Sequence, residues 1–182
     1  MTIGSAILVS IALSIDTFAV SMSGSVSMGR LRLAKVAGVA LSLAFVQTVF
    51  LLGGYYAGDA VARLIEKWGR YLGFAMLLYV GVDMIVEAVR NKEESQDFSG
   101  AWKILVAAVA TSIDAVAVGA SFGLSLVPAG ELWLTAGVTF AATVIFAVSG
   151  MFCGSAVGRA FGRPAKIVAG IVLIAIGLEI LL

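Results

Sequence analysis

Six long hydrophobic runs fill most of this chain, and its Lys and Arg residues all stand between the runs or at their ends. The runs cover residues 3–26, 36–58, 71–90, 103–126, 131–157 and 165–182. Each run approaches the ~20 residues that an α-helix needs to cross about 30 Å of hydrocarbon. Because backbone groups in lipid must satisfy one another within the segment, runs of this length predict helices. The pattern therefore predicts an all-α polytopic membrane protein with six transmembrane helices.

The composition agrees with a lipid bilayer as the solvent. The chain has 182 residues, of which 61% are hydrophobic and 13% charged, and its mean hydropathy is +1.08. A soluble domain carries about 25% charged residues. The net charge of +1 gives no sign of a nucleic-acid partner. The absence of His and the single Cys, Cys153, exclude a Cys/His zinc site, a disulfide framework and a histidine proton relay.

Basic residues predict the orientation of the chain in the membrane. Nine of the 12 Lys and Arg fall on one side of the predicted helices: Arg30, Arg32, Lys35, Arg90, Lys92, Lys103, Arg159, Arg163 and Lys166. The positive-inside rule places that side in the cytoplasm, so both termini are expected outside it. For a bacterial protein this describes a multi-pass protein of the inner membrane, with residues 91–102 as a cytoplasmic linker.

Three segments of the first half recur in the second half, in the same order. The matches are SIDTFAVSMSGS (14–25) with SIDAVAVGASFG (112–123) at an offset of 98, then GYYAGDAVAR (54–63) with GMFCGSAVGR (150–159) and LLYVGVDMI (77–85) with LIAIGLEIL (173–181) at an offset of 96. Residues 1–90 and 103–182 are therefore predicted to be two copies of a three-helix repeat. Three spans end on the side opposite their start, so the second copy must be inverted, as in many secondary transporters.

Each copy places one aspartate inside an otherwise apolar helix. Asp16 and Asp114 occupy equivalent positions, which a two-fold axis would bring together near the midplane. A carboxylate at the bilayer centre costs at least ~2.5–3.5 kcal/mol. Apart from Arg90, Lys103 and Lys166 at span ends, the predicted spans contain no Lys, Arg or His that could balance it. A bound cation is the natural partner, although an isolated aspartate can also be a structural hydrogen-bond anchor.

Other oxygen-bearing side chains accompany the two aspartates. Hydroxyls follow each aspartate at i+7 and i+11, which lie within about 20° of one line on a helix. Gln47 is the one strongly polar group of its run, and Thr143 is its counterpart in the repeat. Oxygen ligands suit Mg²⁺, Ca²⁺ and Mn²⁺, whereas Zn²⁺ and copper prefer His and Cys. The candidate metal ligands are Asp16, Asp114, Ser23, Ser27, Ser121, Ser125, Gln47 and Thr143.

Simpler interpretations stay open for several of these residues. The serines and Gln47 are equally compatible with helix packing. A four-spaced ladder from Gly150 to Gly162 indicates close packing, either between helices or in a homodimer. Glu87 and Arg90 are spaced for a surface ion pair, while the deeper Asp83 has no assigned role.

The chain resembles the bacterial manganese efflux pump MntP family, which is related to the lysine-exporter-type superfamily. The resemblance covers essentially the whole chain and is most specific in SIDTFAVS (14–21) and TSIDAVAVG (111–119), with GLEILL at the end as weak support. It implies export of Mn²⁺ across the inner membrane, with Asp16 and Asp114 as the essential aspartates. Some members carry Glu and Pro in the second helix where this chain has Gln47 and Leu51, a difference that bears on metal affinity and selectivity.

These observations predict a secondary transporter that exports Mn²⁺ as its substrate, without a cofactor. Two close carboxylates in low dielectric repel each other, so the metal-free pair is expected to hold a proton, and this predicts exchange of Mn²⁺ for protons. Export of another divalent cation or of a cationic amino acid remains an alternative. A paired intramembrane aspartate could also belong to an aspartyl protease. Such enzymes resemble each other in a Gly-x-Gly-Asp motif, which is absent before both Asp16 and Asp114, so no enzymatic activity is expected.

Overall fold

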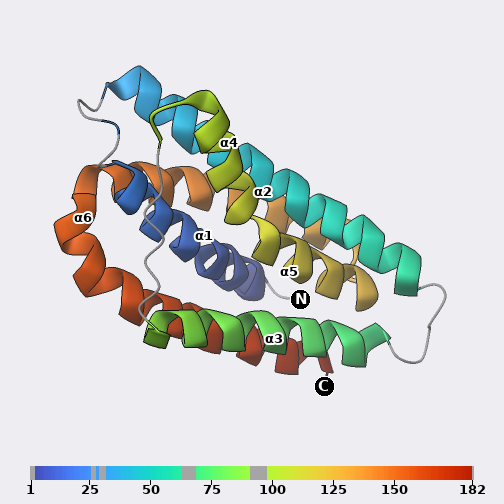
Figure 1. The fold of residues 1–182 in the computed structure, drawn as a ribbon. Helices are drawn as coiled ribbons and strands as arrows, with labels where there is room; N and C mark the ends of the chain where they lie inside the picture. The colour runs from blue at the N-terminus through green and yellow to red at the C-terminus, as the bar shows by residue number, and fades with distance from the viewer. Residues whose placement is uncertain (1–2, 26–27, 29–31, 63–68, 91–97, 182) are drawn as a thin grey trace.

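The computed structural model describes residues 3–25, 28, 32–62, 69–90 and 98–181 of the chain. Within these ranges the chain forms helices only (Figure 1). The helices are α1 (Ile3–Ser25), α2 (Leu33–Ala62), α3 (Gly69–Arg90), α4 (Ala101–Ala110), α5 (Ile113–Leu124) and α6 (Ala129–Leu181).

Most of these helices have the length and hydropathy of membrane spans. In the described part of the chain, four segments qualify singly, Gly4–Ser25, Leu33–Ala62, Tyr71–Arg90 and Ala129–Cys153, and the bent pair α4 and α5 makes a fifth. A shorter apolar stretch, Ile167–Glu179, follows within α6. Many large apolar side chains on these helices are exposed, such as Trp102 and Tyr79, as expected where lipid is the solvent. The chain is an all-helical polytopic membrane protein, as the hydrophobic runs predict.

The fourth predicted helix is interrupted, which the hydrophobic pattern does not show. The run 103–126 contains two helices, α4 and α5, bent by 41° relative to each other. At the break, Thr111 Oγ1 donates to Ala107 O at 2.9 Å and Ser112 Oγ donates to Ala108 O at 2.6 Å. Hydroxyls that bond back to the preceding turn compete with the backbone ladder and bend helices. The sequence Thr-Ser immediately before Ile113 therefore accounts for the break.

The last two predicted helices are joined without a loop. The runs 131–157 and 165–182 belong to one 53-residue helix, α6, which contains Pro164. Figure 1 shows α6 bending back, so that its last part runs beside α3. A proline removes one backbone hydrogen bond and kinks a helix without having to unwind it. The prediction of two separate helices is wrong in this respect, but its two apolar segments remain as the two arms of α6.

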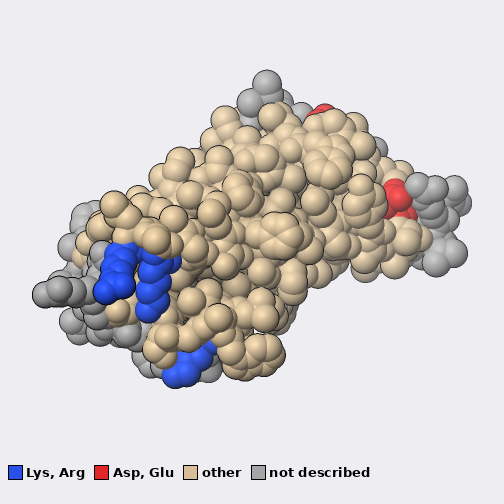
Figure 2. Space-filling view, turned by 90° about the horizontal axis from the view of Figure 1, so that it is seen from above, with Lys and Arg blue, Asp and Glu red and all other residues tan. Residues whose placement is uncertain are grey.

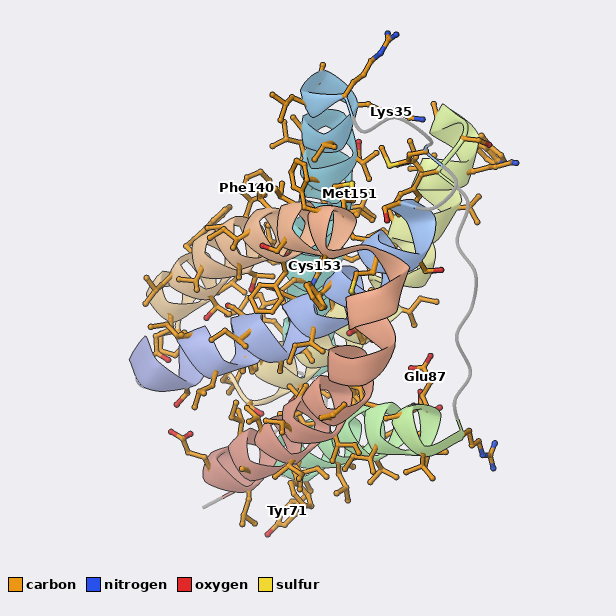
Figure 3. The ribbon with its side chains drawn as sticks, turned by 90° about the vertical axis from the view of Figure 1, so that its left-hand side faces the viewer. Lys35, Tyr71, Glu87, Phe140, Met151 and Cys153 are labelled. Carbon is orange, nitrogen blue, oxygen red and sulfur yellow. The ribbon has the colours of Figure 1, made fainter. Side chains whose placement is uncertain are left out.

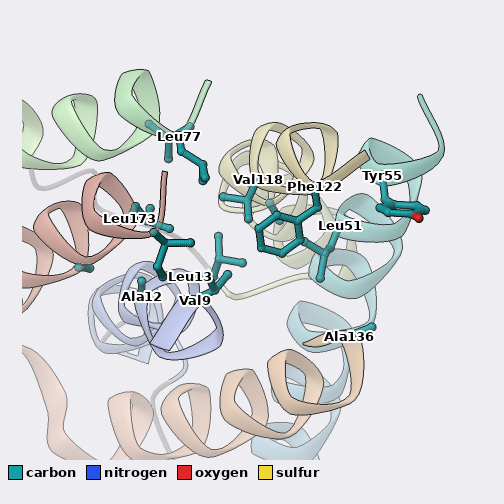
Figure 4. Close-up of a cluster of buried hydrophobic side chains, with 14 of the residues drawn as sticks. Val9, Ala12, Leu13, Leu51, Tyr55, Leu77, Val118, Phe122, Ala136 and Leu173 are labelled. Atoms are coloured by element: carbon teal, nitrogen blue, oxygen red, sulfur yellow. The ribbon is translucent and has the colours of Figure 1, made fainter. Parts of the chain in front are cut away.

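The core lies where the helices of the two halves pack on each other. The main packed pairs are α1 with α6, α2 with α5, and α3 with α6. Buried side chains from five helices form one apolar cluster, called here the central cluster (Figure 4). It includes Val9, Leu13, Leu51, Leu77, Val118, Phe122, Ala136 and Leu173.

Charged side chains separate toward the two ends of the molecule. The helix bounds put Arg32, Lys35, Arg90 and Lys103 at one end, called here the basic end. Asp59, Glu131 and Glu179 lie at the other end, called here the terminal end because α1 begins and α6 ends there. Figure 2 shows blue side chains gathered at one end and red ones at the opposite end. This polarity agrees with the predicted distribution of basic residues.

Candidate functional site

The two aspartates lie in different local settings, although their sequence motifs match. Asp16 is half-buried in the middle of α1, which continues unbroken through it. Asp114 is half-buried in the first turn of α5, two residues after the break from α4, and its Oδ1 accepts a hydrogen bond from Ala115 N at 2.9 Å. The N-terminus of a helix favours negative charge, so the break creates a suitable place for a carboxylate.

Both aspartates border the same core. Their sequence neighbours Ile15 and Ala115 are buried and belong to the central cluster. Figure 4 shows α1 residues Val9 and Leu13 on the side of α1 toward Val118 of α5. The structure therefore places the two acidic motifs on helices that contribute side chains to one packed interior.

Gln47 fastens α2 to the turn of α1 that carries Asp16. Its side chain is 1% exposed. Thr17 Oγ1 donates to Gln47 Oε1 at 2.9 Å, and Gln47 Nε2 donates to Leu13 O at 3.1 Å. An amide oxygen has two lone pairs, so the bond from Thr17 leaves Oε1 able to accept or coordinate once more. Gln47 thus clamps α2 to α1 through Thr17, the residue that follows Asp16 in the sequence.

Hydroxyls join α1 to α6 on another side of the same turn. Ser14 Oγ lies 3.3 Å from Thr143 Oγ1, and Ser10 Oγ lies 2.8 Å from Thr139 Oγ1. Thr143 Oγ1 also donates to the carbonyl of Thr139 at 2.7 Å, which occupies its proton. All four side chains are buried. Thr143, a candidate ligand, therefore takes part in a ladder of hydroxyls that holds two helices together.

The remaining candidate serines are spread along the helices. Ser121 is buried and donates to Gly73 O of α3 at 2.7 Å, and a Cβ placed on Gly73 would lie 2.6 Å from Ser125 Oγ. Both serines thus face α3, where they serve close helix packing. Ser23 is half-buried near the end of α1, and Ser27 lies outside the described residues. In the ranges that the structure describes, no three His, Cys, Asp or Glu side chains come close enough to hold a metal ion. A cation held by Asp16 and Asp114 would therefore need neutral oxygen ligands as well.

Glycines on α2 and α6 meet the two aspartate-bearing segments in matching ways. A Cβ placed on Gly54 would collide with the carbonyl oxygen of Val116, and one placed on Gly150 would lie 2.6 Å from the carbonyl oxygen of Phe18. Gly54 and Gly150 are 96 residues apart, and Phe18 and Val116 are 98 apart, which are the offsets of the sequence repeat. Backbones pack directly at both places because neither glycine carries a side chain.

Residues 30–181 match the protein family described as "Mntp: Putative manganese efflux pump". The chain belongs to this family. The match contains Asp114 and Gln47, whereas Asp16 precedes it. The resemblance inferred from the two SID segments is confirmed.

Full-length relatives of the manganese efflux pump family extend the match over the first helix. A protein of Bifidobacterium adolescentis named "Putative manganese efflux pump MntP" is 34% identical over 180 residues, covering 96% of this chain and 93% of the relative. A protein of Escherichia fergusonii named "Probable manganese efflux pump MntP" is 31% identical over 185 residues, covering 100% of this chain and 97% of the relative. These names describe transporters and not enzymes. No solved structure matches the chain.

The sequence pattern does not identify several residues that position the helix carrying Asp16. Thr17, Ser10, Ser14 and Thr139 make the buried contacts that hold α1 in place. Their only sequence signal is the spacing of four in Ser10 and Ser14 and again in Thr139 and Thr143, which puts each pair on one helix face. That spacing does not say which helix the face will meet.

Proposed function

We propose that the chain exports Mn²⁺ from the cytoplasm across the bacterial inner membrane, through a site built on Asp16 and Asp114. Membership of the manganese efflux pump family carries this proposal. It is supported by the two half-buried carboxylates next to the central cluster, since charged groups in transmembrane helices mark ion pathways. The basic end faces the cytoplasm, and both termini lie outside it.

The transporter has six spans arranged as two inverted three-helix repeats, 1–90 and 103–182, joined by the linker 91–102. The paired contacts of Gly54 with Val116 and of Gly150 with Phe18 support this arrangement, because a pseudo-two-fold axis exchanges one contact for the other. The packing of α1 on α6 and the packing of α5 on α2 are likewise equivalent, because the repeat relates α1 to α5 and the first arm of α6 to α2. In this arrangement the two arms of α6 are the fifth and sixth spans.

Asp16 and Asp114 supply the charged ligands for Mn²⁺, and Gln47 Oε1 is the leading neutral ligand. Gln47 already contacts the α1 turn that carries Asp16, and its second lone pair is available. Water and backbone oxygens complete the shell, as hard divalent cations accept. Thr143 and Ser121 hold helices together in this proposal, because Thr143 contacts Ser14 of α1 and Ser121 donates to the carbonyl of Gly73 on α3.

Protons are the counter-ion for Mn²⁺ export. When the metal leaves, the two carboxylates lose the charge that balances them in a medium of low dielectric. Taking up a proton restores that balance, and the return stroke carries it inward. Mn²⁺ binding on the next cycle releases it.

Purified protein in proteoliposomes tests the proposal directly. Wild type is expected to move Mn²⁺ across the vesicle membrane and to respond to an imposed pH gradient. Asp16→Asn and Asp114→Asn are each expected to lower transport by ~100-fold or more, because each removes a charged ligand. Asp59→Asn, the same change on α2 at the terminal end, is the matched control and should transport normally.

A metal panel separates the main alternatives. We expect Mn²⁺ to raise the melting temperature of the wild type more than Mg²⁺ or Ca²⁺ does. The two Asn variants are expected to lose this stabilisation. Stabilisation by lysine or arginine instead would identify an exporter of cationic amino acids. Normal Mn²⁺ transport by either Asn variant would show that the site is elsewhere, and Mn²⁺ flux that ignores a pH gradient would remove proton exchange.

A further inference from the structure

A hydrogen-bonded contact joins the first turn of α1 to the last turn of α6. Ser5 Oγ of α1 lies 3.2 Å from Glu179 Oε1 and 3.0 Å from Glu179 Oε2 of α6, and the hydroxyl donates to the carboxylate. Ser5 is buried and Glu179 is exposed. The contact lies at the terminal end, where it holds the start of α1 against the last arm of α6.

The sequence repeat assigns a counterpart to each partner. At an offset of 98, Ser5 corresponds to Lys103 of α4, and at an offset of 96, Glu179 corresponds to Asp83 of α3. The second correspondence falls inside the matched segments at 77–85 and 173–181, where both copies have an acidic residue. The counterpart of the Ser5–Glu179 contact is therefore a Lys–Asp pair at the basic end.

That counterpart is not formed in this structure. Asp83 is exposed on α3, and Lys103 Nζ donates to Ser99 Oγ at 3.2 Å. Figures 1 and 3 share a vertical axis, and in both α4 lies above α1 while α3 lies below it. Of the described helices, α1 and α6 are extensively packed, whereas α3 and α4 are not among the extensively packed pairs. The two halves of the molecule thus differ at equivalent places.

We infer that Ser5–Glu179 and Lys103–Asp83 are two gates that close alternately during transport. The inference rests on the proposed inverted repeat and export function. In the state described here the contact at the terminal end is made, and its counterpart pair at the basic end is apart. When the halves exchange conformations, α4 approaches α3, Lys103 moves from Ser99 to Asp83, and Ser5 separates from Glu179. A two-fold related transporter must pass through this mirrored state, because each half then adopts the conformation of the other.

The chemistry of the two gates fits their surroundings. The inner gate would pair a cation near the start of α4 with a carboxylate about two turns before the end of α3, and such a pair strengthens as the closing helices exclude water. The outer gate uses a hydroxyl, which keeps a positive charge away from the path by which a cation leaves. Asp83, which neither the metal site nor surface pairing explains, has a role in this arrangement.

Charge reversal tests the inner gate. Asp83→Lys and Lys103→Asp should each lower Mn²⁺ transport by ~10-fold or more, and the double variant should recover to within about threefold of wild type, since neighbouring charges couple in double-mutant cycles. The matched control exchanges the charge one turn away, Glu87→Lys with Lys103→Asp, and should not recover. Equal transport by the single variants and wild type, or equal recovery with Glu87, would overturn the inner gate.

Disulfide cross-linking tests the alternation and does not depend on reversed charges. In a Cys153→Ser background, Ser5→Cys with Glu179→Cys and Asp83→Cys with Lys103→Cys should each form a disulfide that stops transport until it is reduced. In the four-cysteine variant, molecules that carry both disulfides should be far fewer than the product of the two separate yields. Independent formation of the two disulfides, or no disulfide between positions 83 and 103 in active protein, would overturn the inference.

The two proposals fail in different ways. Wild-type vesicles that do not move Mn²⁺ would refute the proposed function, while mutually exclusive disulfides in the same preparation would still support two alternating gates. Wild-type vesicles that export Mn²⁺, together with disulfides that form independently, would refute the gates alone.

Discussion

Thr17 Oγ1 donates a hydrogen bond of 2.9 Å to Gln47 Oε1, which ties α2 to the residue that follows Asp16. Gln47 returns a hydrogen bond to the carbonyl of Leu13, so that one amide spans a full turn of α1. The side chain at position 47 therefore influences the stability of the helix pair and fixes the turn of α1 that carries Asp16.

Replacing Gln47 should separate its structural role from its role toward metal. Gln47→Leu is expected to lower the free energy of unfolding by about 1–3 kcal/mol, because the buried groups of Thr17 and Leu13 lose their partner. Gln47→Glu keeps an acceptor for Thr17 and adds a charge beside Asp16, which should raise Mn²⁺ affinity by ~10-fold or more. Thermal unfolding with and without Mn²⁺ measures both effects.

A control for position 47 lies next to it on α2. Thr48 Oγ1 is buried and, among the described residues, makes no hydrogen bond. Thr48→Val should therefore change stability by less than about 1 kcal/mol and leave Mn²⁺ affinity as it is. If Gln47→Leu proved as mild as Thr48→Val, the clamp would contribute nothing to stability.

Gly119 should tolerate no side chain. A Cβ at this position would collide with the carbonyl oxygen of Leu51, because α2 and α5 approach backbone to backbone. Gly119→Ala is expected to lower the free energy of unfolding by about 1–3 kcal/mol through overpacking, or to prevent folding. The melting temperature in detergent, or the folded yield, measures the effect.

Gly137 is the matched control for that substitution. It lies on α6, and a Cβ placed there meets nothing within 4 Å. Gly137→Ala should keep or raise the melting temperature, since alanine is favoured over glycine in a helix by about 1 kcal/mol. Equal loss of stability in Gly119→Ala and Gly137→Ala would contradict the close approach of α2 and α5.

Leu126 is a point of strain that glycine should relieve. Its φ of 54° is in the left-handed region, at the position after α5 where helices usually place glycine. The hydrogen bonds Leu126 N to Gly123 O and Val127 N to Phe122 O, both 3.1 Å, form the Schellman pattern that requires this conformation. Leu126→Gly should therefore stabilise the protein by about 1 kcal/mol, or about 2–4 °C in melting temperature.

The same substitution within a helix should have the opposite sign. Leu134 is 41% exposed within α6. Leu134→Gly is expected to cost about 1 kcal/mol from helix propensity alone. A lower melting temperature for both glycine variants would mean that the left-handed residue carries no strain in the folded protein.

Local sequence patterns are enough to predict that the protein is a helical membrane protein and where most of its apolar segments lie. Hydrophobic runs determine helices in lipid, because each backbone bond must be satisfied within its own segment. An isolated carboxylate such as Asp16 is conspicuous for the same reason, since lipid offers it no partner. Both signals are local, and they can be recognised from neighbouring residues alone.

Which helix faces meet, and where the helices break, depends on packing between distant segments. The bend between α4 and α5 depends on Thr111 and Ser112 bonding backward, and the continuity of α6 through Pro164 depends on its two arms packing on α1 and α3. Hydrophobicity does not distinguish either case from an ordinary span. The partners of Gln47 are 30 and 34 residues away in the chain, and those of Ser5 are 174 away. Contacts at such separations arise only when helices pack, because a polar side chain shows what it needs and not which helix will provide it.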